Sequence, residues 1–325
     1  MRPTGALASL EAALDRRLPV IAQAHDFPDV DAFGAAWALA SLLAARGYDA
    51  APAFRGGLRS RSLANMAREL GAPVNPAPDE SSVERSIVSV DCIPENGNVE
   101  LFPGTLAGAI DHHVPAAAPN APFADLRIDS GSCCSIIVDY WREAALEPER
   151  RVATALLAGL QADTDFLSRG AGPLDVEAFH WLSSRADRDQ AARLVKTALA
   201  PGELKLLAAA LQAATLADSA LFAVVGRARD IEAPALLADF ALRAEDVSVA
   251  LVASVDDEGV RISIRSRDPL VPAFDAARAL VAGIGSGGGH GRSAGGRIAL
   301  SEFPGEEALG ARFFDAVRSL RAHQS

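Results

Sequence analysis

Six histidine and aspartate side chains, spread over four short segments, have the types and spacing needed to bind divalent metal ions. They are His25, Asp29, Asp31, Asp91, His112 and Asp163. The set is rich in oxygen and contains no thiolate, so we predict Mn²⁺, with Mg²⁺, Co²⁺, Fe²⁺ or Zn²⁺ as alternatives. Four carboxylates are enough for two ions. Two ions about 3.5–4 Å apart can generate a hydroxide that attacks phosphorus.

Each of the four segments also has an ordinary structural explanation, because aspartate is common in turns and at helix N-termini. The three candidate ligands of segment 25–31 have the same parity, so in an extended loop they would point the same way. Two adjacent histidines directly after Asp111 are less common in a surface loop. Asp163 and Asp165 compete for the same role. The prediction of a metal site therefore depends on the segments meeting in space.

Three of these segments directly follow apolar runs that are typical of buried β-strands. Residues 19–24 precede His25, residues 87–90 precede Asp91, and residues 107–110 precede Asp111-His112-His113. Helix-like segments alternate with these runs, which predicts an α/β domain built on a parallel sheet with helices on both faces. Because ligands of such sheets bind beyond the carboxyl ends of the strands, we expect the polar residues to meet at one edge.

A length of 325 residues predicts two domains rather than one. Residues 173–218 have helical patterns and no strand pattern, whereas short strand patterns return after Ala220 with two helices between them. We therefore predict a catalytic metal-binding domain at 1–185, a helical linker at 186–218 and a smaller mixed α+β domain at 219–325.

A glycine-rich segment, residues 283–296, lies in the predicted second domain. Three of its glycines formally satisfy the GxGxxG pattern of dinucleotide-binding folds, but the pattern follows a helix-like segment and lacks the downstream acidic residue. A glycine-rich loop exposes backbone N–H groups that an anion can approach closely. A flexible linker is the alternative, which His290 and Arg292 disfavour. Arg265 would add donors to a phosphate.

The composition limits the partners. A formal net charge of −11 gives no general attraction to a long polyanion, so we expect no long duplex nucleic acid. Three cysteines without a CxxC pair predict neither disulfides nor a thiolate zinc site, and favour a reducing, cytoplasmic location. Charges interrupt every apolar run, so no signal peptide, membrane span or membrane partner is expected. A homodimer is compatible with the sequence.

Taken in order, these motifs resemble those of the DHH phosphoesterase superfamily. The matching positions are His25–Asp31, Asp91, Asp111–His113 and Asp163–Thr164, followed by 262–266, 287–290 and 293–295, which resemble the DHH-associated C-terminal domain. The length resembles the stand-alone oligoribonuclease and phosphoadenosine-phosphate phosphatase group, which is nanoRNase-like and related to RecJ. Phe27, Val30 and Asp165 stand where the superfamily usually has Asn, Gly and Gly.

The resemblance implies that the six metal ligands are divided between two ions. One ion is held by His25 and Asp29, the other by Asp31, His112 and Asp163, and Asp91 bridges them. The resemblance further implies that a hydroxide between the ions attacks phosphorus. His113 would contact the scissile phosphate or stabilise the departing oxygen, and Asp111 would orient the surrounding groups.

The second domain is expected to bind the substrate's terminal phosphate or base across a cleft between the domains. The residues implied by the resemblance are Arg265, Ser266, Gly287, Gly288, Gly289, His290 and Arg292. The leading hypothesis is hydrolysis of short oligonucleotides, including linear dinucleotides, or of 3′-phosphoadenosine 5′-phosphate. An inorganic pyrophosphatase or exopolyphosphatase is the second hypothesis. A non-catalytic nucleotide sensor is the third, which the complete ligand set disfavours.

Overall fold

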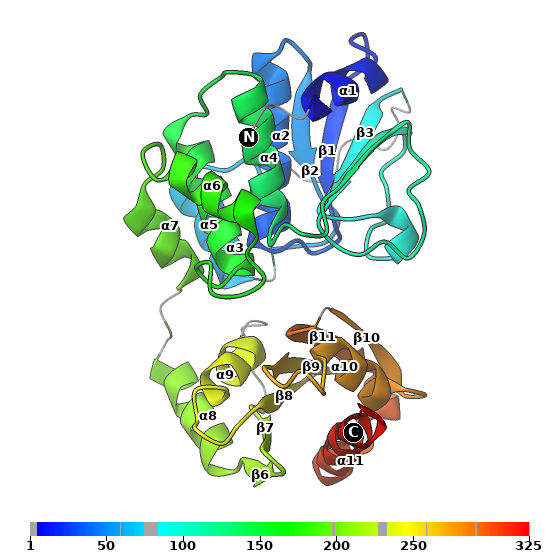
Figure 1. Ribbon diagram of the computed structural model, residues 1–325, viewed down its shortest axis with the longest axis vertical. Coiled ribbons are helices and arrows are strands. Elements are labelled where there is room, and N and C mark those ends of the chain that lie inside the picture. The colour runs from blue at the N-terminus through cyan, green and yellow to red at the C-terminus, as the bar shows by residue number, and fades with distance from the viewer. Residues whose placement is uncertain are drawn as a thin grey trace. The chain divides into compact units, whose positions relative to one another are not determined.

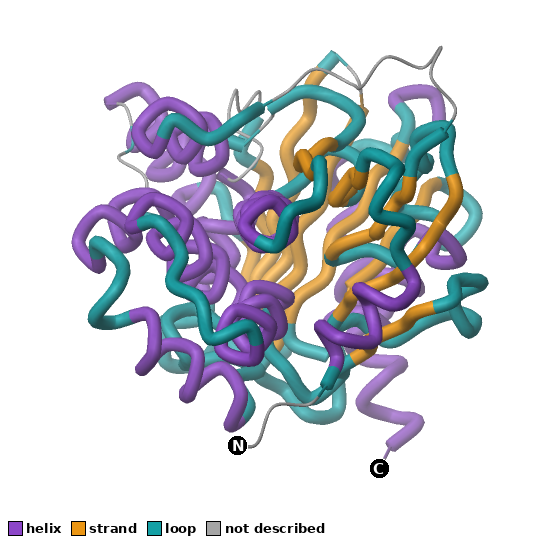
Figure 2. Tube along the Cα trace, turned by 90° about the horizontal axis from the view of Figure 1, so that it is seen from above, coloured by secondary structure: helices purple, strands orange, loops and turns teal. Residues whose placement is uncertain are grey.

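The computed structural model describes residues 5–58, 60–74, 84–196, 199, 201–226, 233–257, 259–289 and 291–324. The chain divides into two compact units, Met1–Ala198 and Leu199–Ser325 (Figure 1). Figure 2 colours the parts of the chain that form helices, strands and loops. None of the described helices combines the length and the apolarity that crossing a lipid bilayer requires.

The first unit is built on a five-stranded parallel sheet in the order β2-β1-β3-β4-β5, which confirms the predicted α/β class. Its strands are β1 (Val20–Ala24), β2 (Ala50–Ala53), β3 (Ser86–Val90), β4 (Thr105–Asp111) and β5 (Phe123–Leu126). Its helices are α1 (Ala6–Ala13), α2 (Val30–Ala45), α3 (Arg61–Leu70), α4 (Cys133–Glu143), α5 (Arg150–Asp163), α6 (Pro173–Leu182) and α7 (Arg188–Val195), with the 3₁₀ turn η1 (Pro94–Asn96).

The two faces of this sheet are covered differently. Ala22 and Val88, which pair across β1 and β3, belong to one large apolar core with the helices α1 to α5. Their neighbours Ile21 and Ile87 point to the opposite face and pack with Phe102. Glu100 and Phe102 belong to the loop that precedes β4. The buried Gln23 side chain holds this loop against the sheet, because its amide donates to the Glu100 carbonyl (2.9 Å) and its oxygen accepts from the Phe102 N–H (2.9 Å). Among the described residues, the loop of residues 97–104 packs on this face, where a second layer of helices was predicted.

The second unit has a six-stranded mixed sheet in the order β10-β11-β9-β8-β7-β6, in which only the β7–β8 pair is parallel. Its strands are β6 (Thr215–Ala217), β7 (Ala220–Val224), β8 (Val249–Asp256), β9 (Gly259–Ser266), β10 (Gly285–Gly289) and β11 (Ser293–Ile298). Its helices are α8 (Pro201–Gln212), α9 (Ala233–Ala241), α10 (Ala273–Val281) and α11 (Glu306–Gln324), with the 3₁₀ turn η2 (Leu300–Glu302). Helices α10 and α11 contribute to the core on one face, and α8 and α9 to the core on the other.

The glycine-rich segment differs from its prediction as a loop, because residues 285–289 form the edge strand β10. The pairing is close: a Cβ at Gly285 would lie 2.3 Å from the Arg297 carbonyl oxygen, and one at Gly289 would lie 2.4 Å from that of Ser293. Glycine therefore allows β10 to approach β11, and the residue type that suggested a loop is what the strand requires. His290 lies outside the described residues.

The helices of the predicted linker at 186–218 are divided between the two units. Helix α7 packs against α5 of the first unit, whereas α8 packs against α9 and β7 of the second. The division between the units accordingly falls at residue 198. The location of the active site in a cleft between the domains stays a prediction.

Candidate metal centre

Three parallel strands bring the sequence-predicted histidines and aspartates to one edge of the first sheet. Ala24, Val90 and Ile110 are aligned across β1, β3 and β4 by the strand register. The next residues along the chain are His25, Asp91 and Asp111, so they form a row at the carboxyl ends of the strands. The expectation that these segments meet is confirmed by the register itself.

Asp91 leaves the sheet in an unusual backbone conformation. Its φ is +59°, in the left-handed region that aspartate and asparagine tolerate better than most residues. The Asp91 N–H donates to the Ile110 carbonyl (2.9 Å), which ties this turn to β4. Strained backbone of this kind persists where the surrounding structure enforces it. The turn places a carboxylate that is only 2% exposed at the centre of the row.

The start of α2 supplies two more carboxylates. Asp29 is the N-cap, and its Oδ1 accepts from the Ala32 N–H (2.9 Å). Asp31, in the first turn, is fully buried. Its two oxygens accept from the N–H groups of Cys133 (2.7 Å) and Cys134 (3.0 Å), at the N-terminus of α4. A helix N-terminus favours a carboxylate, so α4 holds Asp31 in place without neutralising its charge.

Gly159 on α5 allows this close approach. A Cβ there would lie 2.5 Å from Cys134 Sγ and 3.0 Å from both the Cα and the Oδ1 of Asp31. We expect Gly159→Ala to lower the free energy of unfolding by about 1–3 kcal/mol, because the overpacking outweighs the better helix propensity of alanine. Urea unfolding measures this. The control is Gly202→Ala in α8, where an added Cβ would meet no atom within 4 Å beyond its chain neighbours and the backbone of its own helix; it should raise stability by up to about 1 kcal/mol. A Gly159→Ala protein as stable as the parent would contradict the packing described here.

The three histidines of the site share one orientation. The Nδ1 of His25 lies 3.0 Å from the Asp26 carbonyl, that of His112 lies 3.2 Å from the Ser130 carbonyl, and that of His113 lies 2.8 Å from Asp111 Oδ1. Oxygen atoms of these kinds accept hydrogen bonds, so each Nδ1 carries a proton and donates it. Each Nε2 is then the atom left to bind a cation or to deliver a proton.

Side chains that could hold cations form three groups in the described part of the chain, and Asp91 belongs to two of them, one of which also contains Asp111, His112 and His113. The ligand atoms of His25, Asp29 and Asp91 lie within 4.8 Å of one another. Those of Asp31, His112 and Asp163 form a second such group, and Asp91 Oδ1 lies 3.3 Å from the Nε2 of His112. All six predicted metal ligands therefore fall into two adjacent sets, with Asp91 between them.

Unsatisfied polar atoms at the centre of the site fit a bound cation. Within the described part of the chain, Asp91 Oδ1 and His112 Nε2 are buried and lack hydrogen-bond partners. His112 Nε2 lies 3.3 Å from Asp91 Oδ1 and 3.3 Å from Asp163 Oδ2, near but not in hydrogen-bond geometry. Buried polar atoms are costly when left unpaired. A divalent cation between these atoms would satisfy them together.

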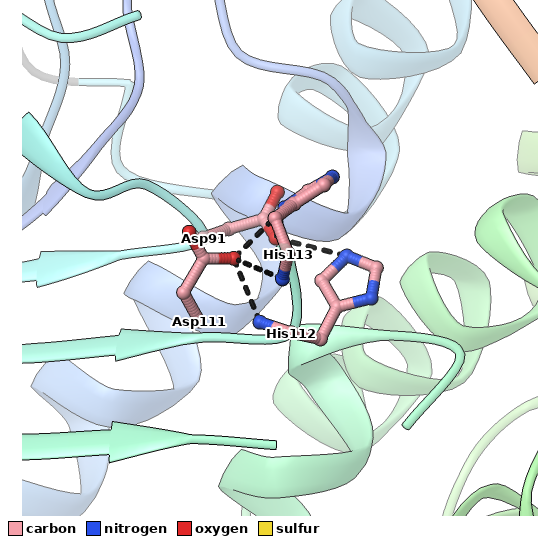
Figure 3. A group of neighbouring side chains, drawn as sticks. All are labelled: Asp91, Asp111, His112 and His113. Carbon is pink, nitrogen blue, oxygen red and sulfur yellow. Dashed lines mark hydrogen bonds and ion pairs between the residues drawn. The ribbon is translucent and has the colours of Figure 1, made fainter. Parts of the chain in front are cut away.

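Asp111 connects the two adjacent histidines, as Figure 3 shows. Its Oδ1 accepts from the backbone N–H groups of His112 (2.7 Å) and His113 (3.0 Å) and from His113 Nδ1. Burial opposes protonation of His113, but the Asp111 carboxylate outweighs it and raises the pKa of His113 to about 9. The His113 side chain is 39% exposed.

Negative charge is crowded at the site. Burial, together with the neighbouring Asp163 and Asp91, raises the pKa of Asp31 well above its usual range. Partial desolvation also opposes ionisation of Asp163, but the contact with His112 outweighs it and lowers the pKa of Asp163. The facing carboxylates hold the pKa of His112 well above its usual value, despite burial. Added positive charge would relieve this repulsion.

Asp163 lies at the C-terminal end of α5. The loop that follows is held together by hydrogen bonds from side chains within it. Thr164 Oγ1 donates to the Leu160 carbonyl (2.6 Å) and accepts from the Leu167 N–H (3.0 Å). Residues 165–167 all have positive φ. Arg169 donates to the Asp163 carbonyl (3.2 Å), so this basic residue binds the helix end. The loop thereby fixes Asp163 beside His112.

The structure distinguishes Asp163 from its competitor Asp165. Asp163 belongs to a ligand group, whereas the Asp165 carboxylate accepts from Ser168 Oγ (3.0 Å) at the surface. We expect Asp163→Asn to reduce the Mn²⁺ bound per chain and Asp165→Asn to leave it unchanged, because only the first removes a ligand. Calorimetric titration with Mn²⁺ measures this. Equal metal binding by the two variants would contradict the assignment.

The predicted substrate residues of the second unit gather at one end of β9, β11 and β10. Ser293 pairs with Arg265, and Ala294 pairs with Gly289. Arg265 Nε donates to Asp239 Oδ1 (2.8 Å), and the Ser266 hydroxyl closes a turn by accepting from the Asp268 N–H (3.1 Å). Ser266 is 2% exposed, so its hydroxyl has a structural role. By contrast, Gly287, Gly288, Gly289 and Arg292 are exposed.

Sequence reasoning missed the backbone groups that orient the site. The Ser130 carbonyl, which fixes the tautomer of His112, and the N–H groups of Cys133 and Cys134, which hold Asp31, carry no residue-type signal. Asp175 was also missed. It is fully buried and accepts from Ser130 Oγ and the Gly131 N–H, so it anchors the loop that positions His112.

The comparison with known proteins gives related chains over both units. An uncharacterized protein of Methanocaldococcus jannaschii is 27% identical over 309 residues, covering 94% of this chain and 64% of that protein. A probable manganese-dependent inorganic pyrophosphatase of Deinococcus radiodurans is 29% identical over 178 residues, covering 48% of this chain and 55% of that protein. An exopolyphosphatase-related protein from Bacteroides fragilis, of solved structure, has a TM-score of 0.76 at 18% identity, with 98% of this chain and 97% of that chain covered.

The chain thus spans 64% and 55% of the lengths of its two curated relatives. Two families match it in sequence order: the DHH family, N-terminal domain, over residues 19–160, and the DHHA1 domain over residues 218–316. The first match contains the five strands of the parallel sheet and every predicted metal ligand except Asp163, and the second contains strands β7 to β11 of the mixed sheet. The chain belongs to the DHH phosphoesterase superfamily.

Proposed function

We propose that the protein is a divalent-metal-dependent phosphoesterase that hydrolyses short oligonucleotides or 3′-phosphoadenosine 5′-phosphate. The observation that carries the proposal is the pair of ligand groups with Asp91 between them. His25, Asp29 and Asp91 would hold one cation. Asp31, His112 and Asp163, with Asp91, would hold the other. Divalent cations at such a site supply Lewis acidity toward a phosphoryl oxygen and lower the pKa of water.

Mn²⁺ is the cation we propose, because the donors are oxygen atoms and imidazoles and no thiolate reaches the site. The described cysteines are buried, and burial raises the pKa of each thiol well above its usual value. The related pyrophosphatase of Deinococcus radiodurans is named as manganese-dependent, which supports the same choice.

His113 is proposed as the proton donor to the departing oxygen. Its Nδ1 proton is committed to Asp111, and its raised pKa of about 9 keeps a second proton on Nε2 at neutral pH. Asp111 Oδ1 holds the ring through Nδ1 and the neighbouring main chain through the N–H groups of His112 and His113, so the ring cannot turn without losing its Nδ1 bond. A cationic imidazole beside the metal ligands also favours a bound phosphate.

The second unit supports a nucleotide rather than an inorganic substrate. Exposed glycine backbone in β10 and the exposed Arg292 lie at the same end of the sheet as Arg265. Backbone N–H groups and guanidinium groups are the donors that recognise a phosphate or the edge of a base. The overall charge of −11 disfavours long polyanions, so the proposed substrate is short.

An inorganic pyrophosphatase or exopolyphosphatase is the second candidate. It is favoured by the relatives from Deinococcus radiodurans and Bacteroides fragilis, which are named for pyrophosphate and polyphosphate. The experiment that separates the candidates is a substrate panel with Mn²⁺: RNA of two to five residues, 3′-phosphoadenosine 5′-phosphate, and pyrophosphate. We expect mononucleotide release that a chelator stops. Hydrolysis of pyrophosphate alone would refute the nucleotide hypothesis.

A further inference from the structure

The segment of residues 129–134, which leads from β5 into α4, orients two ligands of one proposed ion site. The Ser130 carbonyl lies 3.2 Å from His112 Nδ1 and fixes the direction of that ring. The N–H groups of Cys133 and Cys134 donate to the two oxygens of Asp31 at 2.7 and 3.0 Å. An imidazole and a carboxylate that are far apart in the sequence are thus held by one stretch of backbone.

The same segment packs against the loop that follows the third ligand of this ion site. A Cβ at Gly131 would lie 2.7 Å from Thr164 Cγ2 and 2.9 Å from the Gly170 carbonyl oxygen, so segment and loop are in close contact. Thr164 directly follows Asp163, which is that third ligand. The position of residues 129–134 therefore bears on every member of the group.

A buried carboxylate on α6 holds this segment. Asp175 is 0% exposed. Its Oδ2 accepts from the N–H groups of Gly131 (2.8 Å) and Gly172 (2.7 Å), and its Oδ1 lies 3.2 Å from the Ser130 hydroxyl oxygen. Buried donors are costly to leave without an acceptor, so these contacts fix the segment relative to the start of α6. Asp175 thereby determines where the Ser130 carbonyl meets His112.

The other proposed ion site has a different support. The Nδ1 of His25 lies 3.0 Å from the carbonyl of the neighbouring Asp26. Asp29 accepts from the Ala32 N–H (2.9 Å), one turn along its own helix. These two ligands are thus oriented by hydrogen bonds within their own stretch of chain. A change in the position of residues 129–134 should therefore reach one ion site and spare the other.

We infer that Asp175 is a positioning residue for the ion held by Asp31, His112 and Asp163, an inference that rests on the proposed metal-dependent function. Asp175 acts through residues 129–134 rather than by contact with the ion. Groups that orient metal ligands set the direction of each donor atom, and their loss typically costs about tenfold to a hundredfold in metal affinity. The consequence is specific: a change at Asp175 weakens one of the two ions and not the other.

Calorimetric titration with Mn²⁺ tests the inference without any substrate. We expect the parent to bind two ions, and Asp175→Asn to bind one of them about tenfold to a hundredfold more weakly. The reason is that asparagine turns one acceptor oxygen into an N–H donor, which would then face other donors. The second ion should bind within about twofold of the parent, as expected for independent sites. Ser130→Ala removes the hydroxyl that faces Asp175 and should weaken the same ion by a smaller factor.

Ligand variants identify the ion that is weakened. His25→Ala keeps the group of Asp31, His112 and Asp163, and there Asp175→Asn should weaken the remaining ion by the same factor of about ten to a hundred. His112→Ala keeps the other ion site, and there Asp175→Asn should change the binding of the remaining ion by no more than about twofold. An equal effect of Asp175→Asn in the two backgrounds would overturn the inference.

Asp187→Asn is the control for a general loss of stability. Asp187 is the N-cap of α7 in the same unit and accepts from the Gln190 N–H (3.0 Å). Loss of this cap should lower Tm and leave the binding of both ions as in the parent. If Asp175→Asn weakens both ions equally, or neither, Asp175 has a structural role alone and the inference is refuted.

The parent protein separates failure of the inference from failure of the proposed function. Hydrolysis that requires two bound Mn²⁺ ions, together with unchanged ion binding in Asp175→Asn, refutes the positioning role and leaves the proposed function standing. A parent that binds a single ion also refutes the selective effect. A parent that binds no Mn²⁺ refutes the proposed metal-dependent function, and the role of Asp175 with it.

Discussion

Asp91→Asn is expected to abolish Mn²⁺-dependent hydrolysis, lowering kcat/KM by about a thousandfold or more. Asparagine matches aspartate in size and tolerates the φ of +59°, so the turn after β3 is kept and only the charge is lost. Asp91 lies between the two ligand groups, so its loss affects both proposed ions. A variant that removed one outer ligand would leave the other ion bound. The measurement is steady-state kinetics on a dinucleotide with saturating Mn²⁺.

Asp26→Asn is the matched control for this variant. Asp26 is next to His25, but its carboxylate accepts from the Glu100 N–H (3.3 Å) and belongs to neither ligand group. We expect its kcat/KM to stay within about threefold of the parent, which is a small change in activation free energy. Near-normal activity in Asp91→Asn would show that the shared-ligand arrangement is wrong.

Mn²⁺ is expected to stabilise the first unit against unfolding, by about 3–4 kcal/mol at a concentration of 100 to 1,000 times Kd. The site holds several carboxylates within a few ångströms, and the pKa of the buried Asp31 is raised by its neighbours. A cation removes this repulsion in the folded state, and the unfolded chain offers no comparable site. Differential scanning calorimetry, with chelator and then with Mn²⁺, measures the shift in Tm.

In the same experiment, the stability of Asp91→Asn should differ from that of the parent both without metal and with Mn²⁺. Without metal, this variant should be more stable than the parent, because one buried negative charge has been removed from a crowded site. With Mn²⁺, it should gain little. An equal rise in Tm for variant and parent would place the stabilising ion elsewhere on the protein.

The sequence predicts the row formed by His25, Asp91 and Asp111, because each of these residues directly follows a short apolar run. Apolar runs that end in a polar residue predict strands, and parallel strands present their carboxyl ends at one edge. The positions of His25, Asp91 and Asp111 therefore follow from the apolar runs before them and from the parallel arrangement of the strands. The α/β class was predictable for the same reason, whereas Asp29, Asp31 and Asp163 lie at helix ends, which the strand pattern does not predict.

Other parts of the fold give no such pattern. Strand β5 is only four residues long and contains Asp125, which pairs with Arg127 rather than contributing to a core. Strand β10 consists of glycine and serine, which are depleted in strands, and forms because glycine permits close pairing with β11. Gln23 reads as a break in an apolar run, yet it is the residue that attaches the covering loop. In each case a single tertiary contact outweighs local propensity.

The hydrogen bonds from Cys133 and Cys134 to Asp31 have a further practical consequence. All three cysteines of the chain, at 92, 133 and 134, lie in the first unit and are 0% exposed. Only the thiolate reacts with alkylating reagents, and burial raises the pKa of each thiol well above its usual value. Modification must therefore wait for the unit to open. The rate at which a thiol reagent labels the native protein therefore reports how often the first unit opens, and opening of the second unit does not contribute to it.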